Sequence, residues 1–199
     1  MKASENQKKY QHKNPLQRFL IKRFQQALYK LIASLNLTTM LDVGCGEGFL
    51  MDYLAKQNIQ VKSIGVDINL DAIMNGKDLF PAKEMINGSA YRLPVPSHSF
   101  DLVLCSEVLE HLDSPRDALI EIKRVMKCDC VITVPNEPLF MITNFLRGKN
   151  VIRFGNHIEH IQHWNVTTFQ KFLKENGLVI KKKSTPFPWI IILASNEEL

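Results

Sequence analysis

The sequence LDVGCGEG occupies residues 41–48 and contains three glycines, Gly44, Gly46 and Gly48. Glycine permits positive φ angles and has no Cβ, so a ligand can lie directly against this backbone. The apolar segment Met40–Val43 predicts a strand before the turn, and Phe49–Gln57 predicts a helix after it. A strand, a glycine-rich turn and a helix begin a βαβ unit, whose helix presents free N–H groups to a ligand. The stretch therefore predicts a site for a polar or anionic ligand.

An acidic residue at the end of the next predicted strand defines the ligand further. Asp67 follows the segment Val61–Val66 and lies 21 residues beyond Gly46, a position from which a carboxylate accepts hydrogen bonds from two ribose hydroxyls. The dinucleotide pattern G-x-G-x-x-G requires a third glycine where this chain has Phe49, which speaks against NAD. The sequence predicts a nucleoside-containing cofactor other than NAD.

Strands and helices alternate along the rest of the chain. Asn69 is the expected cap of a short helix, and Lys127–Cys130 is expected to form a surface turn. The remaining expected strands are Glu84–Asn87, Phe100–Cys105, Cys130–Val134, Leu178–Lys183 and Trp189–Ala194, and the remaining expected helices are Pro115–Met126 and Thr167–Asn176. This alternation predicts a mostly parallel sheet with helices on both faces, and a carboxyl-terminal hairpin.

The amino-terminal part of the chain is strongly basic. Residues 1–30 hold eight Lys or Arg and a single acid, whereas the other 169 residues carry a net charge of −2. Apolar residues at three- and four-residue steps predict an amphipathic helix over Pro15–Leu35. We divide the chain into a basic arm with this helix (1–37) and a main domain (38–199) with an insertion at about 136–165. The arm is either a solvated tail or a contact for nucleic acid, an acidic membrane surface or an anionic substrate.

Composition excludes several protein classes. Hydrophobic residues make up 45% and charged residues 23% of 199, which excludes disordered, collagenous and coiled-coil chains. No apolar run approaches the roughly 20 residues that cross a bilayer, so we expect no membrane span. The amino terminus has no apolar stretch behind its lysines, so the cytoplasm is the expected compartment. Four scattered cysteines predict reduced thiols, with neither a disulfide framework nor a structural zinc site.

Four ordered segments resemble the class I S-adenosylmethionine-dependent methyltransferases, in particular the type 11-like group. These are LDVGCGEG (41–48), the acid at Asp67, GSAYRLPVPSHSFDLVLCSEVLEHL (88–112) and VITVPN (131–136). The resemblance covers about residues 38–195. It implies a Rossmann-like, doubly wound α/β fold in three layers, α/β/α, with a seven-stranded, mostly parallel sheet whose last strand is antiparallel. It also implies S-adenosyl-L-methionine as the cofactor.

Carried onto this chain, the resemblance assigns ten cofactor-binding residues: Asp42, Gly44, Cys45, Gly46, Gly48, Asp67, Ile68, Ser89, Ala90 and Ser106. The glycine turn surrounds the methionine part, Asp67 holds the ribose, and Ile68 and Ala90 flank the adenine. Ser89 stands where many relatives have an aspartate, which implies a weaker or water-mediated adenine contact. The family's usual Pro-Gly-Gly turn before the fifth strand is absent.

Methyl transfer requires the donor and acceptor to be aligned and a proton to be removed. Histidine titrates near neutral pH, so His111 and His160 are the expected catalytic residues, although a structural role for each is open. The apolar segments Leu139–Leu146 and Phe187–Trp189 either line an acceptor pocket or pack in the core. The favoured acceptor is an oxygen or nitrogen of a small molecule.

Two alternatives remain open. One alternative is a metal-assisted RNA methyltransferase, because the metal-binding residues of small-RNA 2′-O-methyltransferases resemble Glu107, Glu110, His111 and His160. The favoured prediction is a site without a metal, and nucleic acid is the less favoured partner. A non-catalytic S-adenosylmethionine-binding subunit is the other. The sequence leaves the acceptor and the oligomeric state open.

Overall fold

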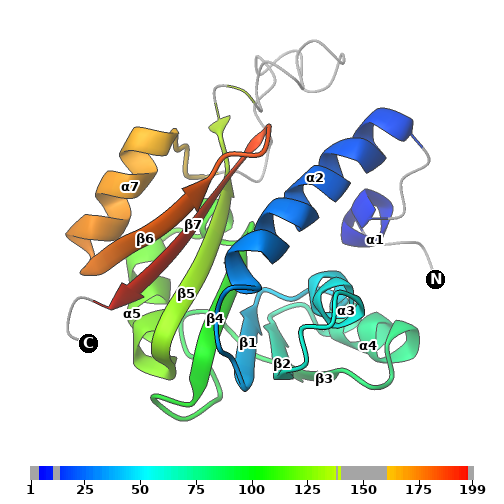
Figure 1. The fold of residues 1–199 in the computed structure, drawn as a ribbon. Helices are drawn as coiled ribbons and strands as arrows, with labels where there is room; N and C mark the ends of the chain where they lie inside the picture. The colour runs from blue at the N-terminus through cyan, green and yellow to red at the C-terminus, as the bar shows by residue number, and fades with distance from the viewer. Residues whose placement is uncertain (1–4, 11–13, 138, 140–160, 197–199) are drawn as a thin grey trace.

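The computed structural model describes residues 5–10, 14–137, 139 and 161–196 (Figure 1). Its strands are β1 (Thr39–Val43), β2 (Lys62–Asp67), β3 (Glu84–Asn87), β4 (Phe100–Ser106), β5 (Met126–Pro135), β6 (Leu178–Ser184) and β7 (Trp189–Asn196). Its helices are α1 (Glu5–Tyr10), α2 (Pro15–Ile32), α3 (Phe49–Lys56), α4 (Leu70–Leu79), α5 (Pro115–Val125) and α7 (Val166–Glu175), with a short 3-10 turn, η1 (Leu109–His111).

The seven strands form one sheet in the order β3-β2-β1-β4-β5-β7-β6. Strands β1 to β5 run parallel to one another, and β7 runs antiparallel to both β5 and β6. The chain moves outward from β1 to β3 and then returns to place β4 on the other side of β1. In such sheets ligands bind beyond the carboxyl ends of the strands at this switch point. The expected Rossmann-like fold, with its last strand antiparallel, is confirmed.

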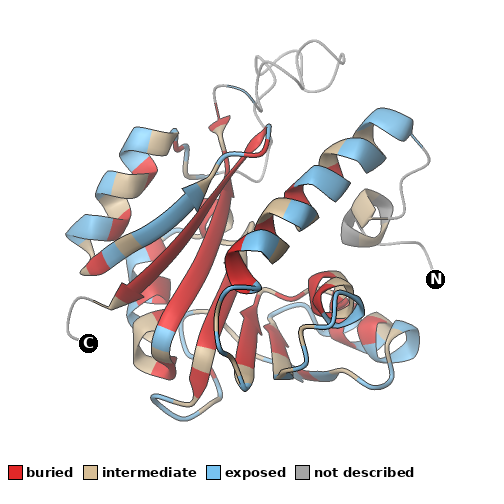
Figure 2. Ribbon diagram, viewed as in Figure 1, coloured by how far each residue is buried: buried red, intermediate tan, exposed pale blue. Residues whose placement is uncertain are grey.

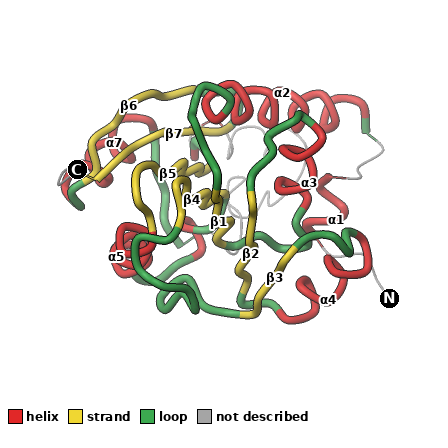
Figure 3. The backbone as a smooth tube through the Cα atoms, turned by 60° about the horizontal axis from the view of Figure 1, so that its bottom comes forward, coloured by secondary structure: helices red, strands yellow, loops and turns green. Residues whose placement is uncertain are grey.

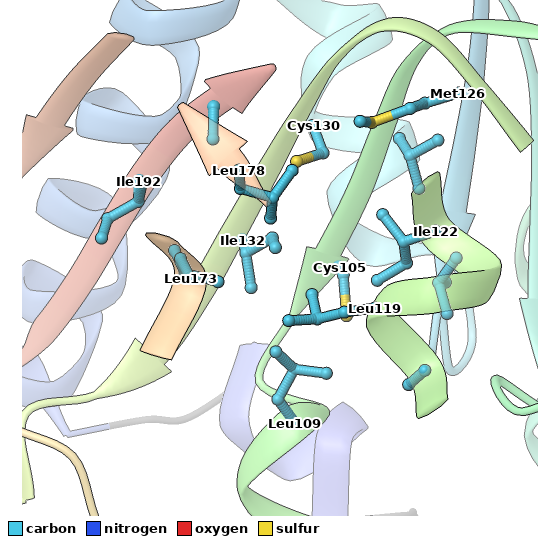
Figure 4. Packing of buried hydrophobic residues seen from close by; sticks show 14 of the residues in the cluster. Cys105, Leu109, Leu119, Ile122, Met126, Cys130, Ile132, Leu173, Leu178 and Ile192 are labelled. Atoms are coloured by element: carbon cyan, nitrogen blue, oxygen red, sulfur yellow. The ribbon is translucent and has the colours of Figure 1, made fainter. Parts of the chain in front are cut away.

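Side chains alternate between the two faces of the sheet, and each face has its own apolar core. Leu41 and Val43 of β1 belong to the core beneath α5 and α7, whereas Met40 belongs to the core beneath α2, α3 and α4. Figure 4 shows the first core, where Leu119 and Ile122 of α5 lie over the sheet. The central strands are buried along most of their length (Figure 2), and Figure 3 shows β4 and β5 between α2 and α5. Helices therefore cover both faces.

Helix α2 confirms the predicted amphipathic helix and ends at Ile32. Asn14 caps it, because its side-chain oxygen accepts hydrogen bonds from the N–H groups of Leu16 and Gln17. The helix buries one face, made of Ile21, Phe24, Leu28, Leu31 and Ile32. This face packs on β7, β6 and α3, so α2 completes one core of the domain. Within the described residues, no helix combines the length and apolarity needed to cross a membrane.

The predicted surface turn at 127–130 is wrong. Strand β5 begins at Met126, directly after α5, and Asp129 and Cys130 already pair with Leu102 and Val103 of β4. The polar sequence suggested a turn, but the carboxylate of Asp129 forms an ion pair with Lys181 of β6. A lysine on β6, two strands away in the sheet, therefore neutralises a charge that alone would disfavour a strand.

The structure describes little of the expected insertion but shows a helix in the basic arm. Most of the expected insertion, together with His160, lies outside the described residues, which here include only 136, 137, 139 and 161–165. By contrast, α1 forms in the basic arm, where the sequence predicted no regular element. The division at residue 37 and the insertion stay predictions.

Candidate functional site

The glycine turn begins where β1 ends. All three of its glycines have positive φ: 73° at Gly44, 54° at Gly46 and 84° at Gly48. The N–H groups of Gly44 and Cys45 both donate to the carbonyl oxygen of Val66 in β2, at 2.7 and 3.1 Å. A Cβ at Gly44 would lie 2.1 Å from Cγ2 of Val108, which follows β4. Both backbone conformation and space therefore require glycine at this position.

Asp67 ties the turn to the end of β2. Its Oδ2 accepts a hydrogen bond from the N–H of Gly46 at 2.7 Å, and its Oδ1 accepts one from the N–H of Asn69 at 2.8 Å. Each carboxylate oxygen can accept a second hydrogen bond, so both can still receive a hydroxyl of a ligand. Asn69 also caps α4 as predicted, because its side chain accepts from the N–H of Ala72.

Asn87, at the carboxyl end of β3, is a site residue that the sequence reasoning missed. Its amide nitrogen donates to the carbonyl oxygens of Asp67 and Ile68, at 3.0 and 2.9 Å. The N–H of Gly88 donates to the same Asp67 oxygen. Asn87 thereby fixes the backbone on which Asp67 stands. A polar residue at the end of a parallel strand was the available signal.

The residues expected around the adenine lie beside this backbone. The side chain of Ile68 is 75% exposed, which provides an apolar surface next to Asp67. Ser89 follows Gly88, and its hydroxyl accepts a hydrogen bond from the N–H of Tyr91 at 3.2 Å. Ala90 packs against the core. The hydroxyl of Ser89 is thus partly committed to its own turn, which agrees with a weak contact to a base.

Asp42 of β1 is buried, and one of its carboxylate oxygens lacks a hydrogen-bond partner among the described residues. Its side chain is only 2% exposed, and the oxygen in question is Oδ2. Burial, together with the negative charge of Asp67, raises the pKa of Asp42 to about 8. A cationic ligand above this carboxyl group would favour its ionised form.

Beyond β4 the chain turns sharply into a second group of carboxyl side chains. The Ser106 hydroxyl shares a hydrogen bond of 2.9 Å with the Thr133 hydroxyl of β5. Glu107 follows with φ = 57°, a rare conformation for a residue with a side chain, and its N–H donates to the Thr133 carbonyl oxygen. Such strained positions cluster at ligand sites.

Glu110 and His111 follow in η1. Glu110 is 1% exposed, and burial, with the negative charge of Glu107, raises its pKa well above its usual range. His111 is half-buried at the end of the turn. Nearby, Nδ1 of His163 lies 3.8 Å from Oε2 of Glu137, which follows β5. The structure thus places His111 in η1, directly after the buried Glu110, whereas His160 is not described.

Helix α1 covers this part of the site, which the sequence did not predict. Lys9 forms an ion pair with Glu107, and Tyr10 stacks on Phe49 at the start of α3, with 5.1 Å between ring centroids. Figure 1 shows α1 beside α2 and α3. No local sequence signal could have found these contacts, because Lys9 and Glu107 are 98 residues apart.

The arrangement fits the expected cofactor. Asp67 can accept ribose hydroxyls, Ile68 can lie against a flat base, and the unpartnered Oδ2 of Asp42 suits a positively charged methionine end. In the described ranges, no three His, Cys, Asp or Glu side chains are grouped so that they could hold a metal.

Sequence comparison agrees with this geometry. Residues 41–134, from the glycine turn to β5, match the Methyltransferase domain family. The mitochondrial ubiquinone biosynthesis O-methyltransferase of Schizosaccharomyces pombe is 30% identical over 152 residues, which cover 70% of this chain and 51% of the relative. The chain thus spans about half the length of this curated relative.

Two solved structures share the fold. A Pyrococcus horikoshii protein superposes with a TM-score of 0.75 at 16% identity, covering 95% of each chain. An S-adenosylmethionine-dependent methyltransferase of Aquifex aeolicus gives 0.64 at 16% identity, over 90% of this chain and 97% of the other. With this fold, the glycine turn, Asp67 and the matched domain, the chain belongs to the class I S-adenosylmethionine-dependent methyltransferases.

Proposed function

We propose that the protein transfers a methyl group from S-adenosylmethionine to an oxygen or nitrogen atom of a small molecule. The observation that carries the proposal is that two sets of residues lie at the same edge of the sheet, beyond the carboxyl ends of the parallel strands. The glycine turn and Asp67 form the donor side, and the buried carboxyl groups after β4 form the acceptor side. The S. pombe relative, which is named as an O-methyltransferase of ubiquinone biosynthesis, supports this acceptor class.

On the donor side the chain provides orientation. Asp67 would accept the ribose hydroxyls while Gly46 and Asn69 hold its carboxylate in place. Asp42 would face the charged methionine end. When bound, S-adenosylmethionine supplies an electrophilic methyl group on a sulfonium, and catalysis depends mainly on holding the acceptor atom in line with it. The remaining ten-residue assignment, including Cys45, Ser89, Ala90 and Ser106, is part of this proposal.

On the acceptor side the chain must remove a proton. The acceptor lone pair forms the new bond to the methyl carbon, the carbon–sulfur bond breaks with its electron pair on sulfur, and the acceptor proton passes to a base. We assign His111 to this role, because imidazole accepts protons near neutral pH. His160 stays a second candidate outside the described residues. Glu110, which precedes His111 in the chain, is only 1% exposed.

The alternative, a metal-assisted RNA methyltransferase, has weaker support in the described residues. One of its expected ligands, Glu107, forms an ion pair with Lys9, so a metal would have to compete with that ammonium group. A non-catalytic cofactor-binding subunit is the other alternative. The compartment also stays a prediction, since composition favours the cytoplasm and the S. pombe relative is named mitochondrial.

The test is transfer of a labelled methyl group from S-adenosylmethionine into separated small-molecule, RNA and protein fractions, with and without a chelator. We expect label among small molecules, indifferent to the chelator. Chelator-sensitive label in RNA would instead support the metal-assisted alternative. Cofactor binding without any transfer would support the non-catalytic subunit.

A His111→Gln variant tests the proposed base. We expect kcat to fall by about 10²–10³ while cofactor affinity is unchanged, since general-base catalysis contributes about this much. The exposed His98, which lies before β4, provides the control variant His98→Gln. Unchanged kcat and an unchanged pH–rate profile in His111→Gln would contradict the assignment.

A further inference from the structure

An ammonium group of the chain itself occupies the acceptor side of the site. The side chain of Lys9 extends from α1 to the end of β4, where its Nζ forms an ion pair with Oε2 of Glu107. Three aromatic rings surround the same nitrogen, with ring centroids at 5.4 Å (Tyr10), 6.0 Å (Phe24) and 5.9 Å (Trp189). A carboxylate and aromatic faces are the groups that bind organic cations in proteins.

The surroundings have more hydrogen-bond acceptor capacity than Lys9 uses. Oε1 of Glu107 and Oε2 of Glu110 are buried, and neither has a hydrogen-bond partner among the described residues. Glu110 is 1% exposed, and the charges of both Glu107 and Lys9 act on its carboxyl group. A buried acceptor without a donor is costly, so these atoms indicate a ligand that brings donors or positive charge.

Lys9 is held here as a cation and is not a nucleophile. Burial alone would lower its pKa, but the charge and the hydrogen bond of Glu107, together with smaller contributions from Tyr10 and Glu110, raise the pKa above the usual range for lysine. Lys9 stands on the short amino-terminal helix α1. Helix α1 has only six residues, too few for a stable helix without tertiary contacts. None of the fully buried core side chains comes from α1 within the described residues.

We propose that this position is a binding site for an organic cation, ammonium or sulfonium. The Lys9 side chain occupies the site in the absence of ligand and is displaced when the cationic ligand binds. This inference rests on the proposed function, because it assigns the site to a ligand of the methyl transfer. Two ligands have this chemistry. One is the cationic end of S-adenosylmethionine, and the other is an acceptor that carries a protonated amine.

The test compares the wild-type protein with Lys9→Met, which keeps the length of the side chain and removes its charge. Lys171→Met is the matched control, since Lys171 is an exposed lysine on α7. Calorimetry measures S-adenosylmethionine binding in one arm. In the second arm n-butylammonium is titrated, both into free protein and into protein saturated with S-adenosylhomocysteine. Lys9→Gln repeats both arms if the Met variant does not fold.

We expect Lys9→Met to bind one of the two probes about tenfold more tightly. The reason is that the Lys9 ammonium group no longer competes with the probe for the site. Tighter S-adenosylmethionine binding assigns the site to the cofactor. Tighter n-butylammonium binding alone assigns it to an amine acceptor. The double variant Lys9→Met/Glu107→Gln should lose the gain.

Equal or weaker binding of both probes by Lys9→Met would overturn the inference. A wild-type protein that binds no S-adenosylmethionine would count against the proposed function, and the n-butylammonium titration of free protein would still test the cation site. The two failures are therefore distinguishable.

Discussion

The carboxylate of Asp67 and the backbone N–H of Gly46 are joined by a hydrogen bond of 2.7 Å, although they lie 21 residues apart. One side chain thus fixes the glycine turn after β1 and also faces the expected position of the ribose. Because the same carboxylate has both roles, a change at Asp67 alters the shape of the turn as well as a ligand contact.

The first prediction concerns this shared carboxylate. Asp67→Ala should weaken S-adenosylmethionine binding by about 1–3 kcal/mol, roughly 5- to 150-fold, since it removes the acceptors for buried donors. Calorimetry measures the affinity, and thermal unfolding should show a parallel loss of stability. Asp71→Ala, an exposed acid in the first turn of α4, is the control. Unaltered affinity in Asp67→Ala would refute the ribose assignment.

The second prediction concerns the pH dependence set by Asp42. Its folded-state pKa, raised to about 8, exceeds the ordinary value of about 3.9 in an unfolded chain. Stability from the protonated group is therefore complete below about pH 4 and decreases as the pH rises toward 8. Asp42→Asn should remove this slope, which urea denaturation at several pH values measures. A wild-type stability that rises across this window, with the same curve in Asp42→Asn, would contradict the prediction.

The same carboxyl group should couple cofactor binding to proton release. A cationic ligand favours ionised Asp42, so the affinity for S-adenosylmethionine should increase between pH 6 and 8. Calorimetry in buffers of different ionisation enthalpy detects the released proton. The Asn variant should bind without this release, and an equal release from both proteins would assign the proton to another group.

The third prediction concerns the space at Gly44. Gly44→Ala should destabilise the protein by about 2–4 kcal/mol, because the new Cβ meets Val108 and the backbone has φ = 73°. Gly177→Ala separates these causes, since Gly177 has φ = 77° in the turn after α7 and should cost only about 1–2 kcal/mol. A Gly44→Ala/Val108→Ala double variant should recover the steric part. Equal losses in the two single variants would show that the contact with Val108 has no effect.

The fourth prediction concerns the entry to β1. Hydrogen bonds from the Thr38 side chain and backbone, together with Lys127, hold the pKa of Asp101 well below its usual range. Stability from this group is present above the unfolded-state pKa and is lost as the pH falls through the folded-state pKa. Asp101→Ala should cost about 1–3 kcal/mol at pH 7, with a smaller difference from wild type below about pH 4. Denaturation of both proteins, with the exposed Asp78→Ala as control, measures the effect; a difference that grows in acid would contradict it.

Local patterns were enough to predict most of the fold. Apolar periodicity indicated α2 and the parallel strands, and Asn69 was correctly expected to cap a helix. The prediction of a turn at 127–130 failed because Lys181, far along the chain, neutralises Asp129 within the sheet. Periodicity describes neighbours in sequence and contains no information about such a partner.

The sequence by itself predicted the cofactor and the residues that we propose to bind it. The glycine spacing, the strand before it and Asp67 after the next strand are local features, and the parallel topology brings strand ends to one edge. Only the tertiary structure decided the rest: the support from Asn87, the unpartnered buried Asp42, and Lys9 against Glu107. These features depend on burial and on contacts between distant segments, because the protonation state of a group is decided by its exposure to water and by the charges around it.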